Sequence, residues 1–159
     1  MYWLLGMAGF ILAADQATKF ALRAALEQGQ TIPLVNGWLQ LTYVRNTGAA
    51  FGLFSHRQPL FVIATVIAVG LILFYHLQTK ESNAWFNIAL GLELGGALGN
   101  LIDRVSLGWV TDFVHVTHFP VFNVADSAIV SGVILLIIAM IVDIRRNPGK
   151  EEPDVPDTV

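Results

Sequence analysis

The sequence predicts an α-helical membrane protein, with four transmembrane helices and a small β-hairpin or sheet element and loop on one membrane face. Composition is the first reason: 55% of the 159 residues are hydrophobic, 13% are charged and the mean hydropathy is +0.62. A soluble domain has about 25% charged residues. The second reason is four long apolar stretches, and the third is two longer polar connections, 22–59 and 105–123.

Each apolar stretch is long enough to cross a bilayer, because roughly 20 helical residues rising 1.5 Å each cover a hydrocarbon core of about 30 Å. The predicted spans are 2–21, 60–77, 84–102 and 124–142. The second, LFVIATVIAVGLILFYHL, contains no acidic or basic side chain other than one histidine. The first opens with MYWLLGMAGFILAAD, which has neither a basic n-region nor a small-x-small cleavage pattern. We therefore interpret it as a retained span rather than a cleaved signal peptide.

The spans and their connections form one predicted domain over 1–147, followed by an acidic tail. The segment KEEPDVPDTV at 150–159 carries four acids and one lysine, and the rest of the chain balances eight bases with eight acids. Because 148–159 is rich in proline and has no apolar periodicity, we predict a disordered cytoplasmic tail there. The sequence has no basic cluster for nucleic-acid binding, and no cysteine for disulfides, thiol nucleophiles or thiolate metal sites.

The polar residues of the spans are all predicted to lie at one membrane face. Four spans place both termini on one side, and three polar motifs fall on the other: DQATK ends the first span, GNLIDR ends the third and FNVADS begins the fourth. Basic residues near the membrane favour the cytoplasmic side but do not agree on the orientation. Those that favour cytoplasmic termini are Lys80, Arg145, Arg146 and Lys150, and those that favour the reverse are Arg23, Arg45 and Arg57.

The two polar connections are predicted to contain β-structure. In TIPLVNGWLQLTYVRN, apolar positions alternate around Asn36 and Gly37, a dipeptide suited to a type I′ hairpin lying on the bilayer. The segment WVTDFVHV also alternates, which would place Asp112 on one face with three valines. A carboxyl among valines loses hydration, so its pKa rises and a protonated form becomes accessible near neutral pH. A general acid needs such a form.

Each polar residue also has a purely structural interpretation. Asn123 could cap the fourth span with Asp126 in its first turn. Asp15 and Lys19 form an i, i+4 pair with the acid first, and the polar end of GNLIDR could simply mark a helix end at the water interface. However, ionisable groups at membrane depth are costly. Their convergence on one face therefore favours a functional site.

Three kinds of chemistry are compatible with these residues. Asp112 and Asp126 form the best pair, because two close carboxylates share one proton, and the ionised one can activate water while the protonated one polarises a carbonyl. Two other arrangements have weaker support. No motif supports a Ser/Lys hydrolase, and in a D-x-x-H-x-x-H metal site the strand residues three apart would point to opposite faces. Their residues are Lys19 with Ser127 or Ser106, and Asp112 with His115 and His118.

A protein of another class, a small four-span transporter that relays protons or cations, remains an alternative. A transporter predicts carboxylates at mid-membrane depth, and Glu93 near the middle of the third span is the candidate. A protease predicts acids at one rim and a dispensable Glu93. Most acids of the body lie at the rim: Asp15, Glu27, Asp103, Asp112 and Asp126.

Five motifs resemble those of the type II, or lipoprotein, signal peptidases of bacteria, in the same order and at the same spacings. They are DQATK (15–19), RNTGAAFG (45–52), LGGALGNLIDRV (94–105), VTDFV (110–114) and FNVADSAI (122–129). The resemblance runs from about Leu12 to Asp143. It implies an intramembrane aspartic protease that removes the signal peptide of a prolipoprotein just before a diacylglyceryl-modified cysteine, on the outer face of the cytoplasmic membrane. It implies no metal or other cofactor.

The resemblance also assigns roles to residues. The catalytic dyad falls on Asp112 and Asp126, and the cyclic peptide globomycin is expected to bind there. The supporting and substrate-binding residues fall on Asp15, Lys19, Asn46, Gly48, Asn100, Asp103, Arg104 and Asn123. Partners are then lipidated prolipoproteins, membrane lipid and globomycin-type inhibitors, and no nucleic acid.

Three further expectations concern the third span and the loop before the second. We expect Asn100, Asp103 and Arg104 to hold the site and the hairpin in place rather than to carry out the chemistry. Small residues of a G-x-x-x-G-x-x-x-G stripe are expected to pack against neighbouring helices; they are Gly91, Gly95 and Gly99. The small-residue segment 46–52 would form a mobile gate over the site. Glu93 departs from the family pattern, which is usually apolar there, and we assign it no catalytic role.

Overall fold

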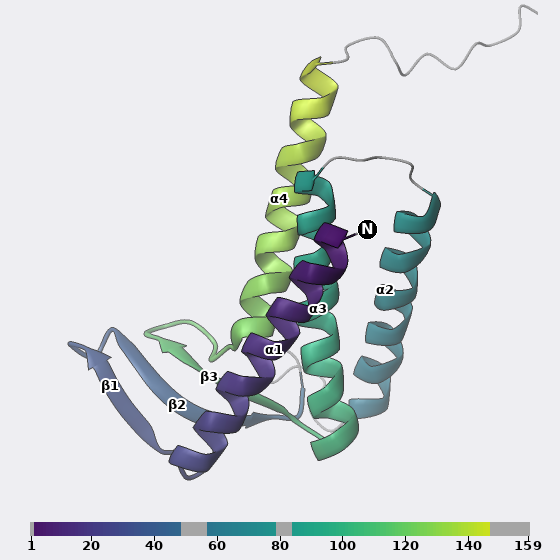
Figure 1. The fold of residues 1–159 in the computed structure, drawn as a ribbon. Helices are drawn as coiled ribbons and strands as arrows, with labels where there is room; N and C mark the ends of the chain where they lie inside the picture. Colours follow the sequence, from purple (N-terminus) through teal and green to yellow (C-terminus); the bar gives the residue numbers. More distant parts are fainter. Residues whose placement is uncertain (1, 49–56, 79–83, 147–159) are drawn as a thin grey trace, which may run out of the picture.

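The computed structural model describes residues 2–48, 57–78 and 84–146, which form four long helices and three strands (Figure 1). The gating segment and the acidic tail expected above lie partly or wholly outside these residues. In chain order the elements are α1 (Tyr2–Ala25), β1 (Thr31–Val35), β2 (Leu39–Asn46), α2 (Gln58–Gln78), α3 (Ala84–Leu107), β3 (Val110–Val116) and α4 (Val124–Arg146).

Helix α3 lies at the centre of the bundle and packs against the three other helices. Figure 1 shows the sheet projecting sideways from one end of the bundle, while the start of α1 and the end of α4 lie away from it. Side chains of Leu4 and Ala8 from α1 meet Leu90 and Leu94 from α3 in a buried apolar cluster. The polar residues of α1 and α3 are therefore brought together at the sheet end.

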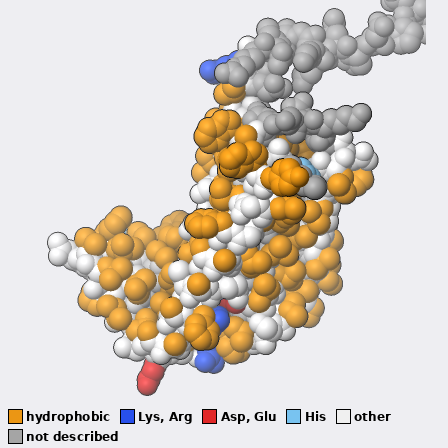
Figure 2. All heavy atoms as spheres, in the orientation of Figure 1, with side chains coloured by type: hydrophobic (Ala, Val, Ile, Leu, Met, Phe, Trp, Pro, Cys, Tyr) orange, Lys and Arg blue, Asp and Glu red, His pale blue; other side chains and the backbone are white. Residues whose placement is uncertain are grey.

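The lengths of the helices agree with the predicted spans, but their apolarity differs. Within the described residues, two helices are both long and apolar enough to cross a membrane: α2, and α4 over Val124–Val142, each with a mean hydropathy of 2.5. No residue of α2 is buried, and Figure 2 shows hydrophobic side chains over most of one face of the molecule. Helices α1 and α3 have 24 residues each but carry buried charges and many small residues. These polar residues build the site described below.

Glycines let α3 approach its neighbours closely, as the small-residue stripe predicts. A Cβ on Gly91 would lie 2.7 Å from the Leu4 carbonyl oxygen, and one on Gly95 would lie 2.7 Å from that of Ala8, both on α1. On the other side of α3, a Cβ on Gly96 would lie 2.5 Å from the Ala125 carbonyl oxygen of α4. Backbone contact of this kind replaces the hydrophobic driving force that lipid does not provide.

The sheet is antiparallel in the order β1-β2-β3. Its hairpin is confirmed: Asn36 has φ 38° and Gly37 has φ 76°, as a turn with two left-handed residues requires. The predicted extended segment around Asp112 is also confirmed, as β3. Its alternation separates two faces, since Phe113 packs with Leu22 and Tyr43 in a cluster against α1, while Asp112 accepts hydrogen bonds from Asn46 of β2 and from Asn123, which directly precedes α4.

The close approach at Gly96 yields a testable prediction. In Gly96→Ala the new methyl group would overlap the Ala125 carbonyl oxygen, so we expect the free energy of unfolding to fall by about 1–3 kcal/mol. Gly9→Ala is the matched control, because a Cβ there meets nothing within 4 Å. Thermal unfolding of both variants in detergent would measure the difference, and equal melting temperatures would show that α3 and α4 do not pack as described.

Candidate active site

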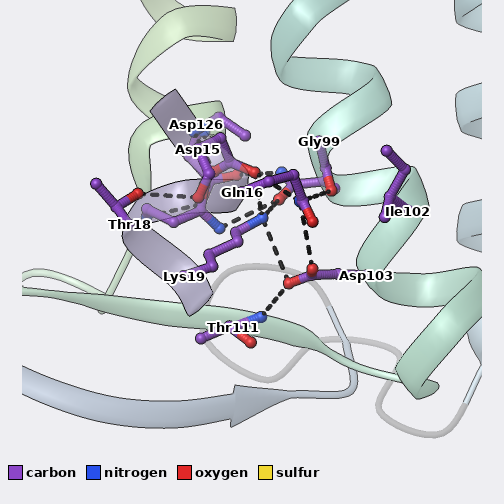
Figure 3. Close-up of polar contacts among 12 residues, drawn as sticks. Asp15, Gln16, Thr18, Lys19, Gly99, Ile102, Asp103, Thr111 and Asp126 are labelled. Atoms are coloured by element: carbon purple, nitrogen blue, oxygen red, sulfur yellow. Dashed lines mark hydrogen bonds and ion pairs between the residues drawn. The ribbon is translucent and has the colours of Figure 1, made fainter. Parts of the chain in front are cut away.

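One face of α1 supplies a row of charged side chains, because Asp15, Lys19 and Arg23 are spaced four residues apart. Lys19 is fully buried, and its ammonium group lies 2.8 Å from Asp15 Oδ2 and 3.4 Å from Asp103 Oδ2. It also donates a hydrogen bond to Asn100 Oδ1 at 2.9 Å. Figure 3 shows Lys19 pointing from α1 toward α3 among these partners. The i, i+4 pair expected from the sequence is confirmed, and it holds the two helices together.

Asp103 joins the end of α3 to the start of β3. Its Oδ2 accepts a hydrogen bond from the Thr111 backbone N–H at 2.9 Å (Figure 3). Its Oδ1 lies 3.6 Å from the Arg23 guanidinium. Arg23 also donates to the Thr111 hydroxyl at 3.0 Å. Because Thr111 directly precedes Asp112, these contacts fix the strand that carries Asp112. Asp103 has 0% exposure, so both of its carboxyl oxygens are committed to these contacts within the protein.

Asp15 connects α1 to the start of α4. Its Oδ1 accepts from the Ala125 backbone N–H at 3.0 Å, one of the N–H groups in the first turn of α4. Beside it, Gln16 donates to Asp15 Oδ2, to the Gly99 carbonyl oxygen and to Asp103 Oδ1 (Figure 3). Gln16 is not among the site residues that the sequence predicts. Its place next to Asp15, on the same polar end of the first span, was the available signal.

Asn123 and Asp126 form a reciprocal cap at the start of α4. The Asp126 backbone N–H donates to Asn123 Oδ1 at 2.9 Å, and the Asn123 backbone N–H donates to Asp126 Oδ2 at 3.2 Å. The capping interpretation is thus correct, and the same residues also serve the site. Asn123 Nδ2 reaches Asp112 Oδ1 at 2.7 Å and links the two aspartates.

Two further asparagines complete the hydrogen bonds to the aspartates. Asn100 Nδ2 donates to Asp126 Oδ1 at 2.8 Å, and Asn46 Nδ2 donates to Asp112 Oδ2 at 2.8 Å. Asn46 is held in turn by the Gly48 N–H, which donates to its Oδ1 at 2.9 Å. Each side-chain carboxyl oxygen of Asp112 and Asp126 therefore accepts an N–H hydrogen bond.

Asp112 and Asp126 line the same cavity, which has a volume of about 370 Å³. Its other polar lining includes Asn46 and Arg104, and the Arg104 guanidinium lies 5.3 Å from the centre of the Phe61 ring of α2. The remaining wall is mainly apolar and consists of Gly48, Val110, Phe119, Pro120, Val121, Phe122 and Val130. A few polar groups in a largely apolar cavity are typical of a substrate site.

The protonation of Asp112 is set mainly by burial. Desolvation, followed by the nearby Asp126, raises the pKa of Asp112 from its ordinary value of 3.8 to about 7, although hydrogen bonds from Asn46 and Asn123 and the charge of Lys19 act in the opposite direction. The expectation of a raised pKa is therefore met. Its cause is burial beside a second carboxyl, so the valines of the strand are only part of the explanation.

The structure brings together the site residues that the sequence predicted and adds three others. The eight supporting residues lie within contact of one another or of the cavity; they are Asp15, Lys19, Asn46, Gly48, Asn100, Asp103, Arg104 and Asn123. The additional residues are Gln16, Arg23 and Thr111. Arg23 continues the four-residue spacing of Asp15 and Lys19, a signal the sequence analysis did not use.

The two alternative hydrolytic or metal arrangements do not form in the described part of the chain. Both serines bond to backbone oxygens within their own helix turn, Ser127 Oγ to Asn123 at 3.0 Å and Ser106 Oγ to Ile102 at 2.6 Å, whereas Lys19 faces carboxylates and an amide. Residues 2–48, 57–78 and 84–146 contain no group of three His, Cys, Asp or Glu placed to hold a metal ion. The His115 ring instead contacts the Thr42 hydroxyl at 3.2 Å.

Glu93 lies apart from this site. It is ten residues before Asp103, about 15 Å along α3, and its Cγ packs where a Cβ on Gly132 of α4 would be. Its buried Oε1 has no hydrogen-bond partner among the residues that the structure describes. Pairing with His76 was one possibility raised by the sequence, and no such bond is found there.

Comparison with known proteins places the chain among signal peptidases. The family model described as signal peptidase (SPase) II matches residues 7–142. A lipoprotein signal peptidase of Pelotomaculum thermopropionicum is 44% identical over 141 residues, 89% of this chain and 93% of that protein. One of Geobacter sulfurreducens is 45% identical over 143 residues, 86% and 89% of the two chains.

Solved structures agree with the sequence relatives. A bacterial membrane enzyme determined by the in meso method at 2.3 Å resolution superposes with a TM-score of 0.85 at 34% identity, covering 95% of this chain and 94% of the other. A second one, at 1.9 Å resolution, gives a TM-score of 0.81 at 35% identity, covering 88% and 93%. These similarities extend over nearly the whole chain, so they include the sheet as well as the helices.

The raised pKa of Asp112 predicts a pH dependence of stability. Between about pH 4 and pH 7 the folded protein keeps a proton on Asp112 that the unfolded chain has lost, so the free energy of unfolding decreases as pH rises through this window. We expect the melting temperature in detergent to fall from about pH 4 to about pH 7, and to fall less in Asp112→Asn. An equal fall in both proteins would mean that Asp112 titrates normally.

Proposed function

The chain belongs to the signal peptidase II family, and we propose that it cleaves diacylglyceryl-modified prolipoproteins just before the lipidated cysteine, as an aspartic endopeptidase. Signal peptidase II activity, and with it a membrane-embedded protease that acts on prolipoproteins, follows from the family and from relatives with 41–45% identity. The aspartic mechanism rests on one observation: Asp112 and Asp126 line a single cavity, and Asn123 hydrogen-bonds to both.

The proposed chemistry uses one proton shared between two carboxyls. An ionised aspartate takes a proton from a water molecule, while the protonated aspartate donates to the carbonyl oxygen of the scissile bond. Burial supports this mechanism, because it raises the pKa of Asp112 to about 7 and makes a protonated carboxyl available at neutral pH. No cofactor is part of the proposal.

The remaining site residues are proposed to position the dyad and substrate. Asn46, Asn100 and Asn123 each donate to a dyad oxygen, whereas Asp15 and Asp103 accept backbone N–H groups at the start of α4 and β3. Three others are assigned as follows: Lys19 holds the acids of α1 and α3, Arg104 faces the cavity, and Gly48 orients Asn46.

We propose that all four helices span the membrane, with the dyad at the outer face and both termini in the cytoplasm. The 24-residue lengths of α1 and α3 support spanning, and basic Arg145 near the end of α4 supports a cytoplasmic C-terminus. The scissile bond would then enter laterally from the bilayer, with its acyl chains in lipid. Globomycin-type inhibitors are proposed to occupy the same cavity.

Cleavage of a diacylglyceryl-modified prolipoprotein by purified enzyme tests this function. We expect Asp112→Asn and Asp126→Asn each to fold and to lose at least about a thousandfold of kcat/KM, since either change removes one proton-transfer group. Folding is checked by thermal unfolding in the same detergent, and globomycin should block the wild type. Normal cleavage by either asparagine variant would exclude the dyad.

Glu93→Gln is the matched control, because it neutralises a carboxyl of α3 outside the cavity. We expect it to cleave at a rate near that of the wild type. The four-span transporter, for which the relatives give no support, would instead require this carboxyl. An inactive but folded Glu93→Gln variant together with an active Asp112→Asn variant would therefore overturn the protease assignment.

A further inference from the structure

We propose that Asp112 carries the shared proton of the dyad, that Asp126 is the ionised member, and that Lys19 is the positioning residue that fixes this arrangement through Asn100. The inference rests on the proposed aspartic mechanism and adds to it the identity of acid and base. It also gives a role in the chemistry to a buried lysine that does not reach the cavity. Figure 3 shows Lys19 pointing toward α3, away from the sheet.

Lys19 determines which way the Asn100 amide faces. An ammonium group only donates hydrogen bonds, so the Asn100 atom at 2.9 Å from Lys19 Nζ must be the carbonyl oxygen. Asn123 Nδ2 donates to the same oxygen at 3.2 Å. The Asn100 Nδ2 group is therefore directed to Asp126 Oδ1, 2.8 Å away. A flip of the Asn100 amide would lose the bonds that its oxygen accepts from Lys19 and Asn123.

The second carboxyl oxygen of Asp126 also accepts from a donor with a fixed orientation, because that donor is a backbone N–H. Asp126 Oδ2 accepts from the Asn123 backbone N–H at 3.2 Å, within the cap of α4. The start of a helix carries a partial positive charge that favours an anion in the first turn. Both carboxyl oxygens of Asp126 thus accept from N–H groups of fixed orientation. One belongs to Asn100, which is oriented by the Lys19 ammonium group, and the other lies at the start of α4. This environment favours a carboxylate at Asp126.

Asp112 has a different environment. It lies on a strand with 2% exposure, while Asp126 is half-buried. Among the described residues, the carboxyl oxygens of Asp112 accept from the neutral side-chain amides of Asn46 and Asn123. Asn46 is oriented by the Gly48 N–H and, in the same part of the chain, contacts neither an ammonium group nor a helix start. Burial next to a second carboxylate accordingly favours the neutral acid, in agreement with the raised pKa of Asp112.

The charges around the dyad agree with one shared proton. Within the described residues, four carboxyls and three cations face this region from α1, α3, β3 and α4. They are Asp15, Asp103, Asp112 and Asp126, with Lys19, Arg23 and Arg104. Full ionisation would leave a net charge of −1 in a buried site, and one proton on the dyad makes the cluster neutral.

The assignment specifies each proton transfer. Asp126 takes a proton from water as the water oxygen bonds to the scissile carbonyl carbon, and Asp112 gives its proton to the carbonyl oxygen, which forms a gem-diol. Asp126 then donates its proton to the nitrogen of the leaving cysteine as the C–N bond breaks. One gem-diol O–H returns a proton to Asp112, which restores the starting state of both aspartates.

The pH profile of Lys19→Met tests the role of the lysine. Activity is lost at low pH when the base is protonated and at high pH when the acid is ionised. Without Lys19 we expect the acid limb of kcat/KM to move to higher pH by about one unit, further than the alkaline limb moves, with kcat affected more than KM. A lower rate with both limbs unmoved would leave Lys19 a purely structural role, and a larger shift of the alkaline limb would reverse the assignment.

Arg23→Met is the matched control, since Arg23 is a second cation on the same face of α1. It contacts Asp103 and Thr111 but not Asn100, so we expect a less stable enzyme whose acid limb moves much less than in Lys19→Met. An equal shift in both variants would show that net charge, and not the Asn100 contact, sets the profile.

Infrared spectroscopy provides a test that does not require Lys19→Met to fold. With ¹³C-labelled aspartate and spectra recorded across pH, we expect the protonated carboxyl band to persist to higher pH in Asp126→Asn, where Asp112 remains, than in Asp112→Asn, where Asp126 remains. The opposite pattern would place the proton on Asp126 and exclude the inference. Because this measurement needs no turnover, it separates a wrong proton assignment from a failure of the proposed protease activity, which the cleavage assay reports on its own.

Discussion

The architecture depends on one buried ion pair, that between Lys19 and Asp15, and on the contacts that surround it. Both side chains have 0% exposure and their charged atoms are 2.8 Å apart. Through Asp103 and Asn100 the lysine joins α1 to α3, and through the Ala125 N–H the aspartate joins α1 to α4. A buried ion pair seldom increases stability over an apolar pair of similar volume. Here the pair fixes one arrangement of three helices, and the proposed dyad depends on that arrangement.

The glycines of α3 make this ion pair possible. Gly99 leaves the space into which Asp15 projects, since a Cβ at that position would lie 2.5 Å from Asp15 Oδ2. Gly95 and Gly96 bring the backbones of α1 and α4 against opposite sides of the same helix. The helix interfaces near the site are therefore built of small residues and buried charges, whereas the apolar bulk of α2 and α4 faces outward. The small residues that allow close helix packing in lipid therefore also make room for the buried charges.

Local features of the fold and site could be predicted from the sequence, and long-range ones could not. The Asn36-Gly37 turn, the cap formed by Asn123 and Asp126, and the Asp15–Lys19 pair each depend on residues within four positions of one another. The bond between Asn46 and Asp112 joins residues 66 positions apart and requires the register of β2 against β3. Arg23 and Thr111 are 88 positions apart. Spacing alone gives no distance across such intervals, so these partners were missed or known only from the family resemblance.

The size of the cavity limits which part of a lipidated prolipoprotein can lie inside the protein. A volume of about 370 Å³ is at the lower end of the range for small-molecule sites, roughly 300–1,000 Å³. It can enclose the few residues around a scissile bond, but not these together with two acyl chains and a signal-peptide helix. Those apolar parts must stay in lipid, beside the outward-facing residues of the helices. In the proposed mechanism the protein then excludes water only where the proton transfers occur, and the bilayer provides the rest of the binding surface. The proposed site at the rim of the bundle, with Asp112 on a strand and Asp126 at a helix start, suits that division.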